Sequence, residues 1–247
     1  METGPRWGAC LMMEEFFTIH AGLPRQGPGE TSDVAWAAEQ AGVKPDAAIC
    51  DAGSGPGGDV GALLRAAPSG HVTAIDMHAP FIDEAKTRFG ENPRVTLIAG
   101  DMAEISGPFD FIWSAGAAYF LGVEGALTLW RKALAAGGAV AFSEPCLFID
   151  TPSDGAIAMW DGYPRLTNAA GIAEQVAAAG FETIATKSVS DIGWESYYRP
   201  IEARVAELRI GADTAMTQAL DAEEREIALW RAHRAETGYL LSVVRPL

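Results

Sequence analysis

From residue 47 onward, short runs rich in β-branched and aromatic residues alternate with stretches in which apolar residues recur at helical spacing. This alternation predicts βαβ units and a parallel sheet. Pro80 suits the first turn of a helix, whereas Gly90 and Gly137 suit helix C-termini. The expected strands are residues 47–51, 71–76, 94–101, 109–114 and 138–144.

After residue 144 the pattern becomes mainly helical, with only two further strand-like runs. The expected elements are helices near 153–162 and 169–179, a strand at 181–189, a helical insertion after Pro200 and a last strand after Gly238. The 247 residues are 49% apolar and 21% charged, which is ordinary for one packed α/β domain.

Net charge limits the classes of partner. Lys and Arg number 18 against 33 Asp and Glu, which gives −15 with no basic block, so neither nucleic acid nor an anionic membrane is expected to bind. Glu14 and Glu15 interrupt the N-terminal apolar run, and no stretch reaches the roughly 18 apolar residues of a membrane span. Cys10, Cys50 and Cys146 are too few and too far apart for a disulfide framework or a metal site. These features favour a cytoplasmic protein.

The turn after the first expected strand is rich in glycine, in the stretch I-C-D-A-G-S-G-P-G-G-D at 49–59. Such a turn between a strand and a helix can present backbone N–H groups to a nucleotide-like ligand. Gly53, Gly55 and Gly58 satisfy the dinucleotide pattern G-x-G-x-x-G, but Gly53, Gly55 and Gly57 equally satisfy G-x-G-x-G. The glycines alone therefore do not identify the ligand.

Acidic residues end three of the expected strands. Asp51 precedes the glycines, where its charge suits a cationic ligand better than a pyrophosphate. Asp76 lies 23 residues after Gly53, at the place of an acid that binds ribose hydroxyls. Asp101 could accept an adenine amino group while Met77 or Met102 packs on the ring. The alternative for Asp76 and Asp101 is helix capping.

These motifs together resemble those of class I S-adenosylmethionine-dependent methyltransferases, bacterial small-molecule type. The matching stretches are D-A-G-S-G-P-G from Asp51, A-I-D-M around Asp76, G-D-M at Asp101 and F-D-F-I-W-S at 109–114. The resemblance covers about residues 30–190. It implies an α/β, Rossmann-like doubly wound seven-stranded sheet, mostly parallel with an antiparallel last strand, plus helical lid insertions.

The resemblance also implies that S-adenosyl-L-methionine is the cofactor. The cofactor-binding residues would be Asp51, Gly53, Ser54, Gly55 and Gly57 at the methionine end, Asp76 and Met77 near the ribose, Asp101 and Met102 at the adenine, and Ser114 at the amino group. The subgroup's R-Q-G-P-G and W-S-x-G-A-x-Y stretches are found at 25–29 and 113–119. Ala115 stands where an acid is common in that subgroup, so no role is assigned to such an acid here.

Methyl transfer depends mainly on placing the acceptor in line with the methyl group and excluding water. A general base helps when the acceptor carries a proton, and the candidate catalytic residues are Glu144, His20 and Tyr119, with Asp161 as a further choice. Glu144 ends a strand at the sheet edge where such folds place their sites. For His20 an ordinary surface or capping role remains the alternative.

Five aromatic residues in the later insertions either wall an apolar acceptor pocket or pack in the core, and they are Trp160, Tyr163, Trp194, Tyr197 and Tyr198. The predicted function is methyl transfer from S-adenosylmethionine to a small-molecule acceptor. An NAD-dependent oxidoreductase and a non-catalytic S-adenosylmethionine-binding protein are the alternatives. The expected organisation is a single domain, 1–247, with a helical lid at 1–45, a cofactor-binding core at 46–145 and acceptor-side elements at 146–247. A homodimer is compatible with the sequence.

Overall fold

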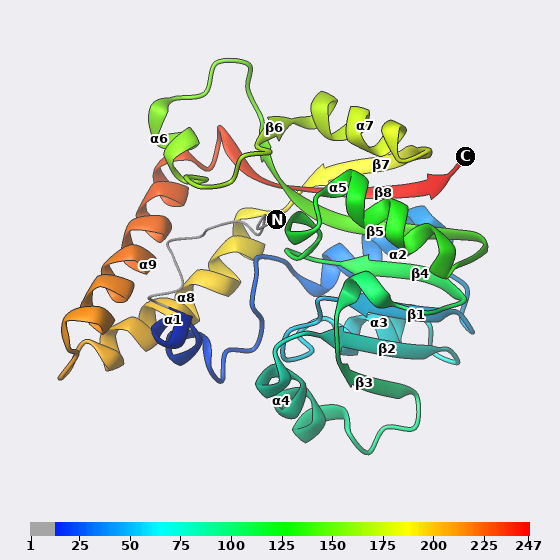
Figure 1. Cartoon of the computed structure of the whole chain (residues 1–247), viewed down its shortest axis with the longest axis horizontal. Helices are drawn as coiled ribbons and strands as arrows, with labels where there is room; N and C mark the ends of the chain where they lie inside the picture. Colours follow the sequence, from blue (N-terminus) through cyan, green and yellow to red (C-terminus); the bar gives the residue numbers. More distant parts are fainter. Residues whose placement is uncertain (1–12) are drawn as a thin grey trace.

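The computed structural model describes residues 13–247, and one mixed sheet forms its centre (Figure 1). Cys10 lies outside the described residues. The strands are β1 Ala48–Ala52, β2 His71–Asp76, β3 Val95–Ala99, β4 Phe109–Ser114, β5 Leu134–Leu147, β6 Thr167–Asn168, β7 Phe181–Ser188 and β8 Thr237–Pro246. Seven of them run in the order β3-β2-β1-β4-β5-β8-β7, and the two-residue β6 pairs with β5 off this path.

Strands β1 to β5 are parallel, whereas β8 is antiparallel to both of its neighbours, β5 and β7. The expected fold class, a mostly parallel Rossmann-like sheet with a reversed last strand, is therefore confirmed. The chain passes from β1 outward to β3 and then returns to the other side of β1 as β4. This reversal of direction is where open α/β sheets bind ligands, at the carboxyl ends of their strands.

The helices cover both faces of the sheet and one of its ends (Figure 1). Helices α1, α8 and α9 contact one another, and α6 contacts α9. The helices are α1 Met13–His20, α2 Thr31–Ala41, α3 Val60–Ala66, α4 Ala79–Phe89, α5 Val123–Trp130, α6 Asp154–Ala158, α7 Ala169–Ala178, α8 Asp191–Leu208 and α9 Thr214–His233. Short 3-10 segments are η1 Met102–Glu104, η2 Ala118–Phe120 and η3 Arg131–Ala133.

Side chains that alternate along the central strands feed two hydrophobic cores, one on each face of the sheet. Ile49 and Phe111 belong to the core that includes α2, α8 and α9, whereas Cys50 and Ile112 belong to the core that includes α5 and α7. All four side chains are fully buried. The near-continuous apolar runs of β1 and β4 are thus the consequence of a sheet covered on both faces.

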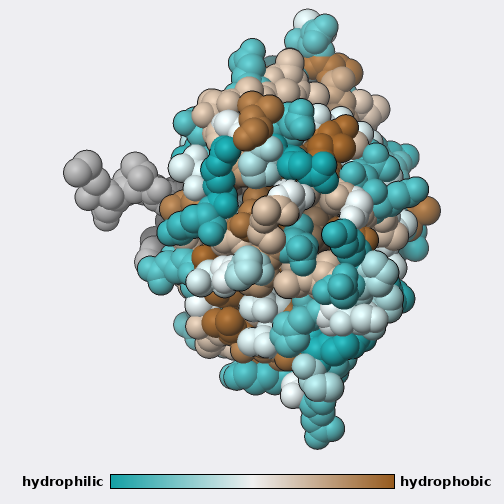
Figure 2. Space-filling model, turned by 90° about the vertical axis from the view of Figure 1, so that its right-hand side faces the viewer, coloured by the Kyte–Doolittle hydropathy of each residue, from teal (hydrophilic) through white to brown (hydrophobic). Residues whose placement is uncertain are grey.

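The surface carries no large apolar patch on the face that Figure 2 shows, where hydrophobic side chains are scattered among hydrophilic ones. Between residues 13 and 247, the structure contains no helix with the length and apolar character that a membrane span requires.

Several expected element boundaries differ from the structure, and three of them involve a glycine or a proline. Helix α8 begins at Asp191 and contains Pro200, because Ser190 caps its N-terminus by accepting a hydrogen bond from the Gly193 N–H at 3.0 Å. Gly137 does not end a helix but lies inside β5 with a φ of +79°. Gly238 lies within β8, where it pairs with Cys146.

Trp230 anchors α9 to α8. It is fully buried, and its ring stacks on Trp194 with centroids 5.2 Å apart and planes 15° apart. We predict that Trp230→Ala lowers the free energy of unfolding by about 3–5 kcal/mol, because it leaves a large cavity. Urea unfolding measures this loss. Ile210→Ala, at a side chain that is 87% exposed, is the control and should change stability by less than about 0.5 kcal/mol. Equal effects of the two substitutions would contradict this packing.

Candidate active site

The glycine turn follows β1 and is folded onto the end of β2. Gly53, Gly55 and Gly57 have φ values of +78°, +53° and +80°, which only glycine adopts without strain. The N–H groups of Gly53 and Ser54 donate to the carbonyl of Ile75 at 2.9 and 3.0 Å. The Gly55 N–H donates to Asp76 Oδ2 at 2.7 Å. The expectation that these N–H groups are free for a ligand was wrong, because β2 accepts them.

Gly53 is instead the point where three segments meet. A Cβ atom on Gly53 would lie 2.3 Å from the Ala117 Cβ and 3.5 Å from the Met102 Sδ. The loop after β4 and the segment after β3 therefore both touch the glycine turn. This contact brings Asp101, next to Met102, into the neighbourhood of Asp51.

Asp51 is the most unusual acid in the site. It is 3% exposed, and its Oδ2 has no hydrogen-bond partner among the described residues. Burial, and then the charges of Asp59 and Asp76, raise the pKa of Asp51 well above its ordinary value, while Arg25 opposes the shift. A buried carboxyl oxygen without a partner suits a ligand that donates hydrogen bonds or carries positive charge.

Asp76 and Asp101 are both partly exposed, and both make the local bonds expected of capping residues. Asp76 Oδ1 accepts the His78 N–H at 2.8 Å, and Asp101 Oδ1 accepts the Ala103 N–H at 2.8 Å. The capping alternative thus holds for Asp101, which caps η1. Each carboxylate keeps further acceptor capacity, since one oxygen can accept two hydrogen bonds.

The remaining expected cofactor residues lie at different depths. Met102 is partly buried beside Gly53, whereas Met77 is 73% exposed. Ser54 is buried in the turn itself. Ser114 is fully buried, and its hydroxyl donates to the carbonyl of Ala52 at 2.9 Å, which joins β4 to β1. Met102 and Ser54 therefore lie at the glycine turn, whereas the Ser114 hydroxyl proton is already donated to the backbone of β1.

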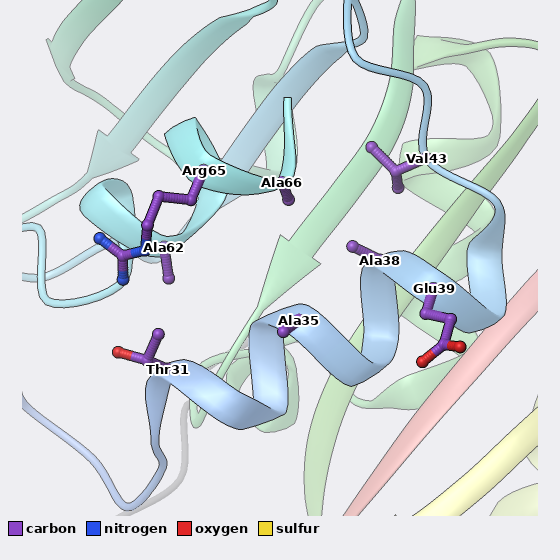
Figure 3. Close-up of a pocket in the computed structure, with 8 residues that line it drawn as sticks. All are labelled: Thr31, Ala35, Ala38, Glu39, Val43, Ala62, Arg65 and Ala66. Atoms are coloured by element: carbon purple, nitrogen blue, oxygen red, sulfur yellow. The ribbon is translucent and has the colours of Figure 1, made fainter. Parts of the chain in front are cut away.

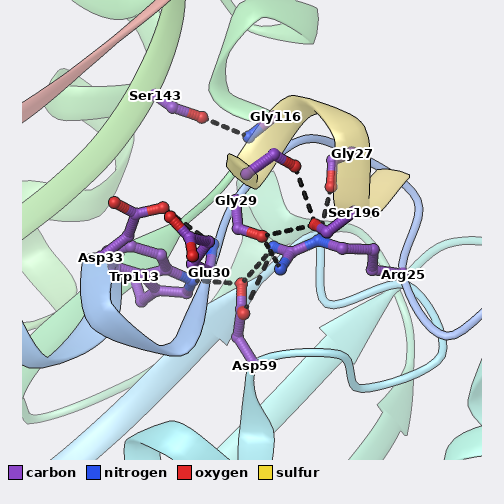
Figure 4. A network of polar contacts seen from close by, with 11 residues as sticks. Arg25, Gly27, Gly29, Glu30, Asp33, Asp59, Trp113, Gly116, Ser143 and Ser196 are labelled. Carbon is purple, nitrogen blue, oxygen red and sulfur yellow. Dashed lines mark hydrogen bonds and ion pairs between the residues drawn. The ribbon is translucent and has the colours of Figure 1, made fainter. Parts of the chain in front are cut away.

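Arg25 binds the segment that precedes α2 to Asp59, which lies directly after the glycine turn (Figure 4). Its guanidinium donates to the carbonyls of Gly27 and Gly29 at 2.5 Å each and to both oxygens of Asp59 at 3.3 Å. Trp113 Nε1 also donates to Asp59, at 3.0 Å. Sequence reasoning noted the R-Q-G-P-G stretch but missed Asp59, whose only signal is its place directly after the glycines.

His20, the last residue of α1, is fully buried, so the surface alternative was wrong. The side-chain amide of Gln26 donates to the His20 carbonyl at 2.9 Å, which points its Oε1 at His20 Nδ1, also at 2.9 Å. Nδ1 therefore donates to Gln26 Oε1, and Nε2 lies 3.2 Å from Glu223 Oε1. The imidazole therefore joins α1 to α9 with both of its nitrogens engaged.

Glu144 lies near the end of β5 and is 2% exposed. Its Oε1 accepts a hydrogen bond from the Tyr163 hydroxyl, whereas its Oε2 has no partner among the described residues. Burial raises the pKa of Glu144 to about 7, against the opposing effects of the Tyr163 hydrogen bond and Arg165. A carboxyl group with this pKa can take a proton from a substrate near neutral pH.

The other acceptor-side candidates divide into two groups. Trp160 and Trp194 pack in the core, with Trp160 Nε1 donating to Thr237 Oγ1 at 2.6 Å. Tyr119 lies beside Tyr163, with ring centroids 6.1 Å apart, and burial raises its pKa well above the ordinary value. Asp161 is exposed. Tyr119 thus lies in the same group of side chains as Tyr163 and Glu144, whereas Asp161 lies on the surface.

Two pockets lie at the edges of this region, and neither is lined by Asp51, Asp76 or Glu144. One, of about 280 Å³, lies between α2 and α3 and is walled mainly by alanine methyl groups and Val43 (Figure 3). The other, also about 280 Å³, lies beside Asp101 and extends down the sheet past Thr73. No group of three or more His, Cys, Asp and Glu residues in the described part of the chain is arranged to hold a metal ion.

Comparison with known proteins agrees with this geometry. Residues 49–138 match the family model of a methyltransferase domain. A methyltransferase of Geobacter sulfurreducens, solved with S-adenosyl-L-homocysteine, is 20% identical, with a TM-score of 0.80 over 95% of this chain and 98% of that chain. YjhP of E. coli is 21% identical, with a TM-score of 0.80 over 95% and 100%. The [4+2]-cyclase SpnF is 17% identical, with a TM-score of 0.72 over 96% and 93%.

A search of curated proteins finds no match. The similar structures share 17–21% of their residues with this chain, so they establish its fold. The expected resemblance to class I S-adenosylmethionine-dependent methyltransferases is confirmed by that fold and by the methyltransferase-domain match over residues 49–138.

The contact at Gly53 can be tested with a matched pair of glycines. We predict that Gly53→Ala lowers the free energy of unfolding by about 3 kcal/mol or more, the sum of left-handed strain and overpacking against Ala117. Gly137→Ala should cost only about 1–2 kcal/mol, because Gly137 has the same φ region but no atom within 4 Å of its Cβ position. Denaturant titration compares the two. A cost at Gly53 no larger than at Gly137 would show that Ala117 does not approach as closely.

Proposed function

We propose that the protein is an S-adenosylmethionine-dependent methyltransferase that acts on a small-molecule acceptor. The observation that carries this proposal is the buried Asp51, whose Oδ2 has no hydrogen-bond partner among the described residues. Asp51 lies next to the glycine turn, and a second strand-end acid, Asp76, accepts a hydrogen bond from that turn. S-adenosylmethionine carries an ammonium group, a sulfonium centre and a ribose, which match a buried acid and acceptor-rich strand ends.

The residues present fit this cofactor. Asp51 and the turn at Gly53 would hold the methionine end, Asp76 the ribose hydroxyls, and Asp101 with Met102 the adenine. When bound, the cofactor supplies an electrophilic methyl group on a positively charged sulfur. The protein's own part is to orient the acceptor, to exclude water with α1 and the Arg25 segment, and to accept a proton at Glu144.

Two other functions use the same fold. A nicotinamide-dependent oxidoreductase is disfavoured because Asp51 would lie beside a pyrophosphate. A protein that binds the cofactor without transferring its methyl group is the second alternative, since one protein of similar fold is named for a [4+2] cyclisation. Methyl transfer is favoured by Glu144, a buried carboxyl group whose pKa of about 7 suits a general base.

We also propose that the protein works in the cytoplasm as a single domain, without nucleic acid or a membrane as partner. A net charge of −15 supports this, because it repels polyanions. Homodimer formation is a further proposal that light scattering of the purified protein tests directly.

Calorimetry with S-adenosylmethionine, S-adenosylhomocysteine and NADH tests the class of ligand. We predict saturable binding of the first two and none of NADH. Asp76→Ala should weaken cofactor binding about 10-fold or more, because it removes charge-assisted hydrogen bonds. Asp76→Asn keeps the side-chain shape, so it separates the lost charge from any loosening of Gly55 and His78.

Asp83→Ala, at an exposed acid paired with Lys86, serves as the control and should leave affinity unchanged. A folded protein that binds neither adenosyl compound would refute the proposed function. Release of S-adenosylhomocysteine when the protein is incubated with S-adenosylmethionine and a metabolite extract would exclude the non-transferring alternative.

A further inference from the structure

All five tyrosines of the chain gather in one place, although they come from four separate segments. Ring centroids lie 6.1 Å apart for Tyr119 and Tyr163 and 5.2 Å apart for Tyr197 and Tyr198. Burial raises the pKa of every one of these tyrosines, and the charge of Glu144, of Glu226 or of both adds to that rise. We name this group the tyrosine cluster: Tyr119, Tyr163, Tyr197, Tyr198 and Tyr239 with Glu144 and Glu226.

Within residues 13–247, neither carboxyl group of the cluster forms an ion pair. Glu144 is buried with a free Oε2, and Glu226, partly buried on α9, accepts a hydrogen bond from the Tyr198 hydroxyl at 3.0 Å. Neither forms an ion pair with a Lys or Arg side chain among the described residues, although Arg165 is close enough to lower the pKa of Glu144. Burial raises the pKa of each to about 7.

The cluster adjoins the glycine turn through two consecutive residues. A Cβ atom on Gly116 would lie 3.6 Å from the Tyr239 ring and 3.8 Å from its hydroxyl oxygen. The next residue, Ala117, is the one that touches Gly53. The tyrosine cluster is therefore next to the place proposed for the cofactor, where an acceptor must lie.

The chemistry of the cluster selects among acceptors. Aromatic faces attract cations, and a buried carboxylate is stabilised by a positive partner. A phosphate or carboxylate acceptor would be repelled by the same acids, and a hydroxyl acceptor would leave the second acid unpaired. An ammonium group satisfies both kinds of side chain.

We propose that the tyrosine cluster is the acceptor site and that the acceptor is a primary or secondary amine that enters as an ammonium ion. This inference rests on the proposed methyl transfer. Glu144 Oε2 takes one proton from the ammonium and frees the nitrogen lone pair. That nitrogen then forms a bond to the methyl carbon, the carbon–sulfur bond breaks, and the electron pair remains on sulfur as a neutral thioether. The product leaves as a methylated ammonium, and the proton on Glu144 passes to solvent.

Three probes with one ring and different head groups test this site: benzylammonium, benzyl alcohol and benzoate. Calorimetry with saturating S-adenosylhomocysteine should show that benzylammonium binds about 10-fold or more tightly than benzyl alcohol, because only it can pair with the carboxylates. Benzoate should not bind. Equal affinity for the amine and the alcohol, or no saturable binding of the amine, would overturn the proposal.

The pH dependence provides a readout that needs no variant. Benzylammonium affinity should rise as the pH increases through about 7, since Glu144 and Glu226 then lose their protons and become charged. Burial raises the pKa of Glu144, and the Tyr163 hydrogen bond and Arg165 oppose it; the Glu144 charge adds to the effect of burial in raising the pKa of Tyr119, Tyr239 and the Cys146 thiol. Burial and the charge of Glu223 raise the pKa of Glu226, and the Tyr198 hydrogen bond and His20 oppose them; the Glu226 charge adds to the effect of burial in raising the pKa of Tyr197. Benzyl alcohol should show no such rise, and a flat profile for the amine would contradict the role of the acids.

Glu144→Gln should weaken benzylammonium binding about 10-fold while leaving S-adenosylhomocysteine affinity unchanged. Glu174→Gln makes the same charge change at an exposed residue of α7 and should alter neither affinity. Thermal unfolding of each variant reports whether the fold is retained. If Glu144→Gln does not fold, the probe series and the pH profile of the unaltered protein still decide the question.

The result distinguishes the two proposals. Amine binding without any adenosyl-compound binding would refute the methyltransferase function but keep the ammonium site. Adenosyl-compound binding without amine binding would refute the ammonium site alone. Competition between benzylammonium and S-adenosylhomocysteine would also overturn it, because the cluster would then belong to the cofactor.

Discussion

The close approach of the loop after β4 to Gly53 is the contact on which the site depends. No side chain fits there, since a Cβ atom would lie 2.3 Å from that of Ala117. Because the turn can fold flat onto β2, its N–H groups are accepted by Ile75 and Asp76. The turn is thereby rigid before any ligand arrives, and a rigid site loses less conformational entropy on binding. The neighbouring residue of the same loop, Gly116, lies against Tyr239, so this loop contacts both the glycine turn and the tyrosine cluster.

Buried negative charge is the main energetic cost of this arrangement. The pKa values of Asp51, Glu144 and Glu226 are all raised in the folded protein, so their ionisation opposes folding as the pH rises above the ordinary carboxyl range. Arg25 offsets part of this near Asp51, and nothing comparable faces Glu144 at ion-pair distance in the described structure. A cationic ligand would remove the cost on both sides. Groups whose pKa values are strongly shifted by burial and by neighbouring charges are found mainly at functional sites.

The sequence was sufficient for features that depend on neighbours along the chain. The strand-end positions of Asp76 and Asp101 and the reversed last strand follow from local patterns, and the structure agrees. The sequence named most members of the tyrosine cluster as acceptor-side candidates but missed Tyr239 and Glu226. That all of them meet could not be predicted, because they are up to 120 residues apart and come together through the packing of α8 and β8. Pro200 misled for a related reason: the capping hydroxyl of Ser190 starts α8 earlier than a proline signal indicates. Asp59 was missed because its partner, Arg25, lies 34 residues earlier in the chain.

Gln26 and His20 connect the glycine turn to α9. Gln26 lies against the glycine turn, where a Cβ on Gly55 would be 3.2 Å from its Cγ, and it also binds both the ring and the carbonyl of His20. The other nitrogen of His20 faces Glu223, which is close enough to Glu226 to raise its pKa. A ligand that displaces Gln26 from the turn would break both of its hydrogen bonds to His20, the residue whose other ring nitrogen faces α9. Since α9 also carries Glu226, we expect ligands at the two proposed sites to affect each other's binding through His20.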